Sequence, residues 1–82
     1  MSKVIVYSTT TCPYCVMAKN WLKDKKVDFE DVNVGINQDR AKEMIKKSGQ
    51  MGVPVIDVDG DIIIGFDRPA IENSLKKKKL VN

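Results

Sequence analysis

Residues 3–15 read KVIVYSTTTCPYC, an apolar run followed by a polar loop, a proline and a pair of cysteines. The run over 3–8 is rich in valine, isoleucine and tyrosine, which is typical of a buried strand. Pro13 is favourable in the first turn of a helix, because its missing N–H would be unpaired there in any case. The stretch therefore predicts a strand that leads into a helix, with Cys12 at the helix start and Cys15 one turn inside.

The rest of the chain continues this alternation of strands and helices. The pattern of apolar residues predicts further elements as follows: a helix over 13–25, a strand over 27–34, a helix capped by Asn37 and stopped by Gly49, strands over 55–58 and 62–64, and a last helix capped by Asp67. The second helix is expected to bury one face, made of Ala41, Met44, Ile45 and Ser48. Asp59-Gly60 predicts a tight hairpin. The order β-α-β-α-β-β-α implies a parallel first pair of strands and an antiparallel last pair.

Length and charge restrict the classes of protein that fit. We expect a single domain over residues 1–82. The run 62–64 is far too short to span a bilayer, and the first residues lack the apolar core of a secretory signal, so a cytoplasmic location is expected. The net charge of +3 is accounted for by four lysines at 76–79. Such a run is typical of a solvated helix end, so neither a nucleic-acid nor a membrane partner is expected.

The spacing of the two cysteines is better explained by a reactive role than by a disulfide that stabilises the fold. A bridge between Cys12 and Cys15 closes a very short loop and so adds little to stability. At a helix start, Cys12 would face unpaired N–H groups and the positive end of the helix dipole. These favour the thiolate, which is the nucleophile, and predict a lowered pKa for the Cys12 thiol. Cys15 lies deeper among apolar residues and is expected to be the resolving thiol.

A pair of cysteines can also bind a metal or fill a purely structural role. Two cysteines in a chain without histidine fall short of the four ligands of a structural zinc site, so no metal is expected. An iron–sulfur cluster shared between two chains stays open as an alternative. A buried structural pair is disfavoured, because Cys12 lies at the junction of a strand and a helix.

Two later segments are candidates for a substrate site. Val53-Pro54 precedes a strand; the proline is a candidate for a cis peptide bond, although the residues alone favour simple punctuation of the strand. Asp67 is expected to cap the last helix, and the same helix start could also hold an ammonium group. Of the residues before it, Gly65 is expected to serve the turn and Phe66 the core or its rim.

These motifs together resemble the glutaredoxin family over nearly the whole chain. The resemblance rests on the CPYC sequence at 12–15, on Val53-Pro54 and on the sequence GFD at 65–67. It implies a thioredoxin-like α/β fold, with a four-stranded mixed sheet flanked by three helices. It also implies a thiol–disulfide oxidoreductase, in which Cys12 attacks a glutathione mixed disulfide or a protein disulfide and Cys15 resolves the intermediate.

The resemblance further implies a binding site for glutathione as co-substrate. Pro54 would be cis, and the backbone of Val53 would pair with the glutathione cysteine as an added strand would. Asp67 and the N–H groups beside it would hold the γ-glutamyl end, and Tyr14 would line the groove. The expected substrate-binding set is Tyr14, Val53, Pro54, Gly65, Phe66 and Asp67. A monomer without a bound cofactor, acting on disulfide-containing proteins, is expected.

Some residues depart from the family pattern and favour alternatives. Thr9 stands where many glutaredoxins have a lysine or arginine, and Gly52 stands where they have a threonine. Gly65-Phe66, followed by Arg68-Pro69, resembles the small redoxins that serve ribonucleotide reductase. Those proteins take electrons from thioredoxin reductase, which is therefore an alternative electron donor. A dimeric iron–sulfur carrier is the third hypothesis.

Overall fold

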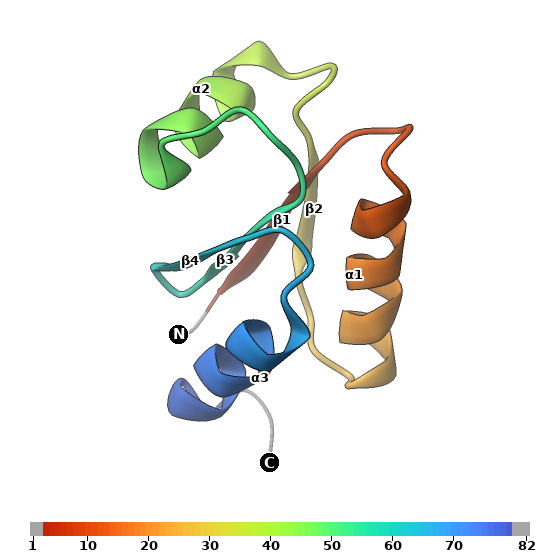
Figure 1. The fold of residues 1–82 in the computed structure, drawn as a ribbon, viewed down its shortest axis with the longest axis vertical. Helices are drawn as coiled ribbons and strands as arrows, with labels where there is room; N and C mark the ends of the chain where they lie inside the picture. The colour runs from red at the N-terminus through yellow and green to blue at the C-terminus, as the bar shows by residue number, and fades with distance from the viewer. Residues whose placement is uncertain (1–2, 80–82) are drawn as a thin grey trace.

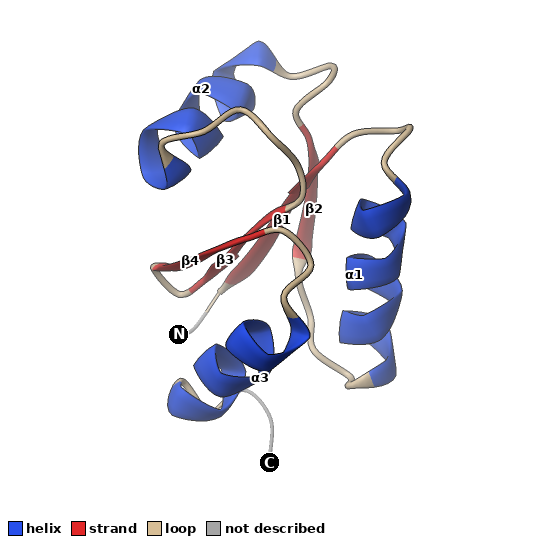
Figure 2. Ribbon diagram, in the orientation of Figure 1, coloured by secondary structure: helices blue, strands red, loops and turns tan. Residues whose placement is uncertain are grey.

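The elements form in the order that the sequence predicts. A computed structural model describes residues 3–79 of the chain. Its elements are β1 (Val4–Ser8), α1 (Pro13–Asp24), β2 (Glu30–Asn33), α2 (Gln38–Ser48), β3 (Val55–Val58), β4 (Asp61–Ile64) and α3 (Arg68–Lys77) (Figures 1 and 2). The predicted order β-α-β-α-β-β-α is confirmed. Within the described residues, no helix is long and apolar enough to cross a membrane.

The four strands make one mixed sheet between two layers of helices. Their order is β2-β1-β3-β4, in which β1 and β2 are parallel and the other pairs are antiparallel. Helices α1 and α3 cover one face of the sheet, and α2 covers the other (Figure 1). Side chains of β1 alternate between the faces, as a strand requires: Val4 and Val6 pack in the larger core cluster, Ile5 and Tyr7 in the smaller one.

The predicted helix ends are confirmed by their capping geometry. Asn37 caps α2, and its side chain accepts a hydrogen bond of 3.1 Å from the N–H of Arg40. Gly49 ends α2 in the left-handed conformation, at φ 74°, which glycine adopts without a steric penalty. Asp67 caps α3 by accepting from the N–H of Ala70 at 3.3 Å.

The second strand is shorter than its sequence predicts. The alternation predicts a strand over 27–34, whereas β2 begins only at Glu30. The segment before it is used to end α1: Lys26 takes a positive φ of 59°, and the N–H of Val27 donates back to the carbonyl of Leu22 at 3.0 Å. Val27 is therefore buried as part of the helix exit rather than as a strand residue.

The inner face of α2 differs from the expected apolar face. Met44 is buried as expected, but Ile45 is 36% exposed, so its placement in the predicted inner face was wrong. Polar side chains occupy the contact with the sheet instead. We call them the α2 cluster; its members are Tyr7, Glu43, Lys47 and Asp57.

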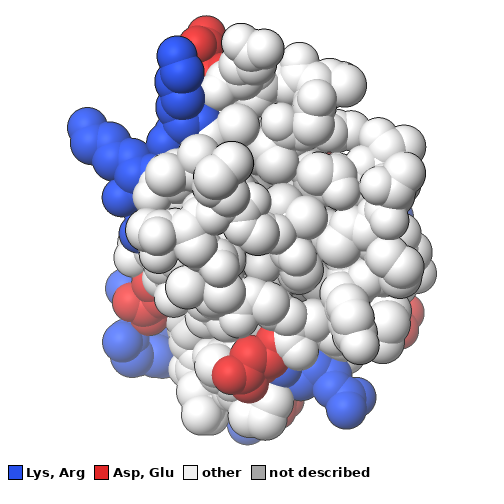
Figure 3. Space-filling model, turned by 45° about the horizontal axis from the view of Figure 1, so that its top comes forward, with Lys and Arg blue, Asp and Glu red and all other residues white. Residues whose placement is uncertain are grey.

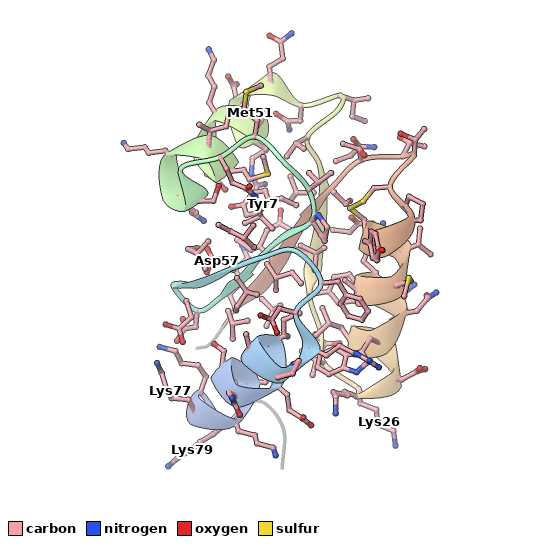
Figure 4. The ribbon with its side chains drawn as sticks, viewed as in Figure 1. Tyr7, Lys26, Met51, Asp57, Lys77 and Lys79 are labelled. Atoms are coloured by element: carbon pink, nitrogen blue, oxygen red, sulfur yellow. A yellow bond between two sulfur atoms is a disulfide. The ribbon has the colours of Figure 1, made fainter. Side chains whose placement is uncertain are left out.

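Hydrogen bonds link every member of the α2 cluster. Lys47 Nζ lies 2.7 Å from Asp57 Oδ2 and donates to Tyr7 Oη at 2.8 Å, while the Tyr7 hydroxyl donates to Glu43. Tyr7 and Asp57 lie on the sheet side of this contact (Figure 4). Burial, and secondly the hydrogen bond to Glu43, raise the pKa of the Tyr7 phenol, so it remains a donor. The cluster therefore fixes α2 to β1 and β3 by directional bonds.

Replacement of Lys47 tests whether the α2 cluster holds α2 in place. We expect Lys47→Met to lower the free energy of unfolding by about 2 kcal/mol, because it leaves the Asp57 carboxylate, which is 6% exposed, without its cation. Urea unfolding measures the change. The control is Lys46→Met at the exposed neighbouring position. Equal unfolding midpoints for the two variants would contradict the assignment.

The loss of stability at low pH tests the ion pairs that Glu30 of β2 makes with Arg40 and Lys3 at the edge of the sheet. A hydrogen bond from Arg40, and secondly one from Lys3, lower the pKa of Glu30 from 4.5 to about 2. A lowered folded-state pKa gives stability that is complete above pH 4.5 and is lost as the pH falls toward 2. Glu30→Gln should reduce this loss, by less than about 1 kcal/mol because the carboxylate is partly exposed.

Urea unfolding at several pH values measures this effect. Asp28→Asn, at an exposed position, serves as the control. It should lose as much free energy of unfolding between pH 4.5 and pH 2 as the wild type does. An equal loss of the free energy of unfolding in Glu30→Gln and in the wild type would show that Glu30 does not contribute to the loss of stability at low pH.

Candidate active site

The two cysteines lie at the N-terminal end of α1, beside the exit of β1. Cys12 is the N-cap of the helix, with extended φ and ψ of −99° and 107°, and Pro13 occupies the first turn. Cys12 and Cys15 are joined by a disulfide, with their Cα atoms 5.2 Å apart (Figure 4). The predicted placement of both residues, at the start of the helix and one turn inside, is confirmed.

The two sulfurs differ in access and in hydrogen bonding. Cys12 is half-buried, whereas Cys15 is fully buried. The N–H of Cys15 donates to Cys12 Sγ at 3.1 Å. This donor belongs to the first turn of α1, where N–H groups have no partner within the helix. After reduction the same N–H and the helix dipole would stabilise negative charge on Cys12, the less buried of the two cysteines.

The Val53–Pro54 segment lies next to the cysteine loop because of the strand register. Tyr7 pairs with Val55, so the residues before β3 run beside those that follow β1. The Val53–Pro54 peptide bond is cis, as the family resemblance implies, and β3 begins directly after it. Pro54 is buried and Val53 is half-buried.

A backbone hydrogen bond joins the 65–67 segment to the proline loop. The N–H of Gly65, which has a positive φ of 82°, donates to the carbonyl of Pro54 at 2.9 Å. Phe66 is partly buried and packs against the core, where its ring meets that of Trp21 edge-on with centroids 6.2 Å apart. Asp67 is exposed and caps α3. The structure therefore joins Gly65 to Pro54, while the Phe66 side chain packs against the core and Asp67 caps α3.

The loop that carries the cysteines is braced by a residue that the sequence analysis missed. Asn33 ends β2; its Nδ2 donates to Thr10 Oγ1 at 3.0 Å, and its Oδ1 accepts from the N–H of Gly35 at 2.9 Å. The predicted strand over 27–34 included Asn33 without a role of its own. An asparagine two residues before a glycine is the available signal, since its side chain commonly closes such turns.

The predicted site residues lie outside the hollow beside α1. A hollow of about 650 Å³ lies along α1 and the residues that lead into β2, and none of the predicted site residues lines it. Tyr14, next to the disulfide, is 62% exposed.

Comparison with known proteins agrees with this geometry. The Glutaredoxin family model matches residues 4–63. A glutaredoxin-like 8.6 kDa protein of the rubredoxin operon of Clostridium pasteurianum is 47% identical over 72 residues, which cover 88% of this chain and 96% of that protein. Glutaredoxin 3 of Escherichia coli (strain K12) is 42% identical over 67 residues, covering 82% of this chain and 81% of that one.

A solved structure shares the fold. The crystal structure of a glutaredoxin from Archaeoglobus fulgidus superposes with a TM-score of 0.84 at 23% identity, covering 93% of this chain and 88% of that one. The expected thioredoxin-like fold is thereby confirmed. With its cysteine pair at the start of α1, the chain belongs to the glutaredoxin family of thiol–disulfide oxidoreductases.

Proposed function

We propose that this protein is a dithiol glutaredoxin that reduces protein disulfides and glutathione mixed disulfides, with glutathione as its electron donor. The observation that carries the proposal is the asymmetry of the disulfide at the start of α1. Cys12 is accessible and receives an N–H donor at 3.1 Å, whereas Cys15 is fully buried one turn deeper. This arrangement suits Cys12 as the attacking sulfur and Cys15 as the resolving sulfur.

The reaction proceeds by two thiol–disulfide exchanges. The Cys12 thiolate attacks one sulfur of the substrate disulfide, so that a mixed disulfide forms and the other substrate sulfur leaves and takes up a proton. The Cys15 sulfur, having lost its proton, then attacks Cys12 Sγ, and the second substrate thiol is released. Two electrons pass to the substrate, and the protein is left with the Cys12–Cys15 disulfide. Two glutathione molecules restore the dithiol and become glutathione disulfide.

The surroundings of the disulfide support a glutathione site. The half-buried Val53 lies before β3, so its backbone is a candidate to pair with an extended peptide. The N-terminus of α3 with the exposed carboxylate of Asp67 suits the γ-glutamyl end, which carries both an ammonium and a carboxylate group. Tyr14 is exposed beside the sulfurs. Gly65 and Phe66 connect these elements, the first by its hydrogen bond to Pro54.

Thioredoxin reductase is a second candidate as electron donor. The observation in its favour is Thr9, which gives no cation for the carboxylates of glutathione, in a stretch without charged residues over 4–18. The chemistry at Cys12 is the same in both cases. NADPH consumption, measured separately with glutathione plus glutathione reductase and with thioredoxin reductase, identifies the donor.

Substitution of each cysteine tests the proposed roles. Cys12→Ser should lose all activity, because no other thiol is accessible. Cys15→Ser should retain turnover of a glutathione mixed disulfide, which a single attacking thiol and free glutathione can complete, and should lose reduction of protein disulfides. Both are followed as NADPH oxidation coupled to glutathione reductase. Full activity of Cys12→Ser would exclude the mechanism, and full protein-disulfide reduction by Cys15→Ser would exclude Cys15 as the resolving thiol.

A further inference from the structure

The short loop that leads to Cys12 is tied to a neighbouring strand by the side chain of Asn33. Residues 9–11 form this loop, which connects β1 to the start of α1. Asn33, at the end of β2, donates from Nδ2 to Thr10 Oγ1 in the middle of the loop, at 3.0 Å. The loop and the segment that follows β2 lie side by side at the top of Figure 1. A residue far away in the sequence therefore contacts the segment that carries the attacking sulfur.

The side chain of Asn33 is held at both ends of its amide group. Its Oδ1 accepts from the N–H of Gly35 at 2.9 Å, so the amide nitrogen is the end that faces Thr10, as a donor. A Cβ on Gly35 would lie 3.1 Å from Asn33 Oδ1 and 3.7 Å from Thr9 Cγ2, so the turn after β2 closely approaches the loop. The hydrogen bond to Thr10 therefore belongs to a close contact in which the amide has one defined orientation.

The backbone around Asn33 is also fixed by the fold. Asn33 lies opposite Ser8 in the parallel pairing of β1 with β2, and the N–H of Val34 donates to the Ser8 carbonyl at 2.9 Å. The Asn33 carbonyl accepts from the N–H of Asn37, the cap of α2, at 3.2 Å. Asn33 is therefore anchored to the sheet on one side and to the start of α2 on the other, and its side chain can hold the loop in a fixed place.

The exact place of Cys12 matters because its stabilisation comes from the backbone of α1. Its Sγ accepts from the N–H of Cys15 at 3.1 Å, and both the hydrogen bond and the field of the helix end weaken steeply with displacement. Residues 4–18 include no charged side chain. Figure 3, which turns the top of Figure 1 forward, shows a broad area without charged side chains. A shift of the loop would therefore weaken a Cys12 thiolate without a cation in this segment to compensate.

From these observations we infer that Asn33 is a positioning residue for the proposed thiol–disulfide exchange: through Thr10 it holds Cys12 at the start of α1, within reach of the N–H of Cys15. The inference rests on the proposed function and adds to it a residue of β2 on which the reactivity of the attacking sulfur depends. The side-chain hydrogen bonds of Asn33 go to Thr10 and Gly35 and to neither cysteine. Its effect on Cys12 therefore passes through the loop.

The pH dependence of alkylation tests the inference without any substrate. In a Cys15→Ser parent protein Cys12 is the only thiol, and its rate of reaction with iodoacetamide rises as the thiolate forms. Asn33→Ala and Thr10→Val should each lower this rate at neutral pH by about fivefold, equivalent to about 1 kcal/mol, through loss of one hydrogen bond. The pH of half-maximal rate should rise. The difference from the parent should narrow at alkaline pH, where all the proteins carry the thiolate.

A double-mutant cycle and two control variants make the result specific. The double variant Asn33→Ala, Thr10→Val should react no more slowly than the slower single variant, because both substitutions remove the same hydrogen bond. Thr10→Ser keeps the hydroxyl and should retain the pH profile of the parent. Thr11→Val makes the same change at the neighbouring exposed position and should also retain it. Thr10 is itself exposed, so Thr10→Val keeps the test valid if circular dichroism shows that Asn33→Ala does not fold.

The outcomes separate this inference from the proposed function. A pH of half-maximal alkylation in Thr10→Val equal to that of the parent would overturn the inference. Effects of Asn33→Ala and Thr10→Val that multiply in the double variant would overturn it as well, because Asn33 would then not act through Thr10. Neither result would affect the proposed function, which fails instead if Cys12→Ser keeps full turnover of a glutathione mixed disulfide.

Discussion

The structure depends on one physical constraint: the first turn of α1 has N–H groups that no residue of the helix can satisfy. The chain meets this constraint with a cysteine rather than with the usual serine, threonine or aspartate. Cys12 is therefore the helix cap and, in the function that we propose, also the reacting group, with the N–H of Cys15 3.1 Å from its sulfur. Pro13 removes one donor from the same turn. Without histidine in the chain, we propose that this backbone environment is the main means of stabilising a Cys12 thiolate.

The rest of the fold places a second backbone segment beside this turn. Antiparallel pairing of β1 with β3 brings Val53 and Pro54 next to the loop that leads to Cys12. The position of that segment also depends on α2, which precedes it. The α2 cluster ties this helix to β1 and β3 through Lys47 and Asp57, so polar contacts on one side of the sheet contribute to the geometry at its end. The other face relies on apolar packing of α1 and α3.

Much of this arrangement could be predicted because local signals and the overall fold agree. Asn37, Gly49 and Asp67 mark helix ends by side-chain or backbone properties that act within a few residues. The predictions that failed have a common cause: contacts between elements far apart in the sequence outweigh the local pattern of apolar residues. Ile45 follows the helical period but is exposed, because Tyr7 and Asp57 give α2 a polar surface to pack on. No pattern within α2 itself reveals a phenol and a carboxylate buried on two strands.

The candidate site likewise contains residues that could be predicted from the sequence and residues that could not. Cys12 and Cys15 could be placed from their spacing and the proline between them, since one helical turn determines their geometry. The role of Asn33 could not be predicted, because it requires the strand register. Phe66, included in the expected substrate site, packs on Trp21 from α1, a contact between residues far apart in the sequence.

In the mechanism that we propose, the start of α1 makes Cys12 the attacking thiol and shields Cys15. Alkylation of the fully reduced protein with a limiting amount of iodoacetamide examines this difference between the two thiols, with mass spectrometry of the peptides to locate the label. The label should appear on Cys12 well before Cys15, because Cys12 lies at the helix start and is the less buried of the two. Equal labelling of the two cysteines, or earlier labelling of Cys15, would contradict it.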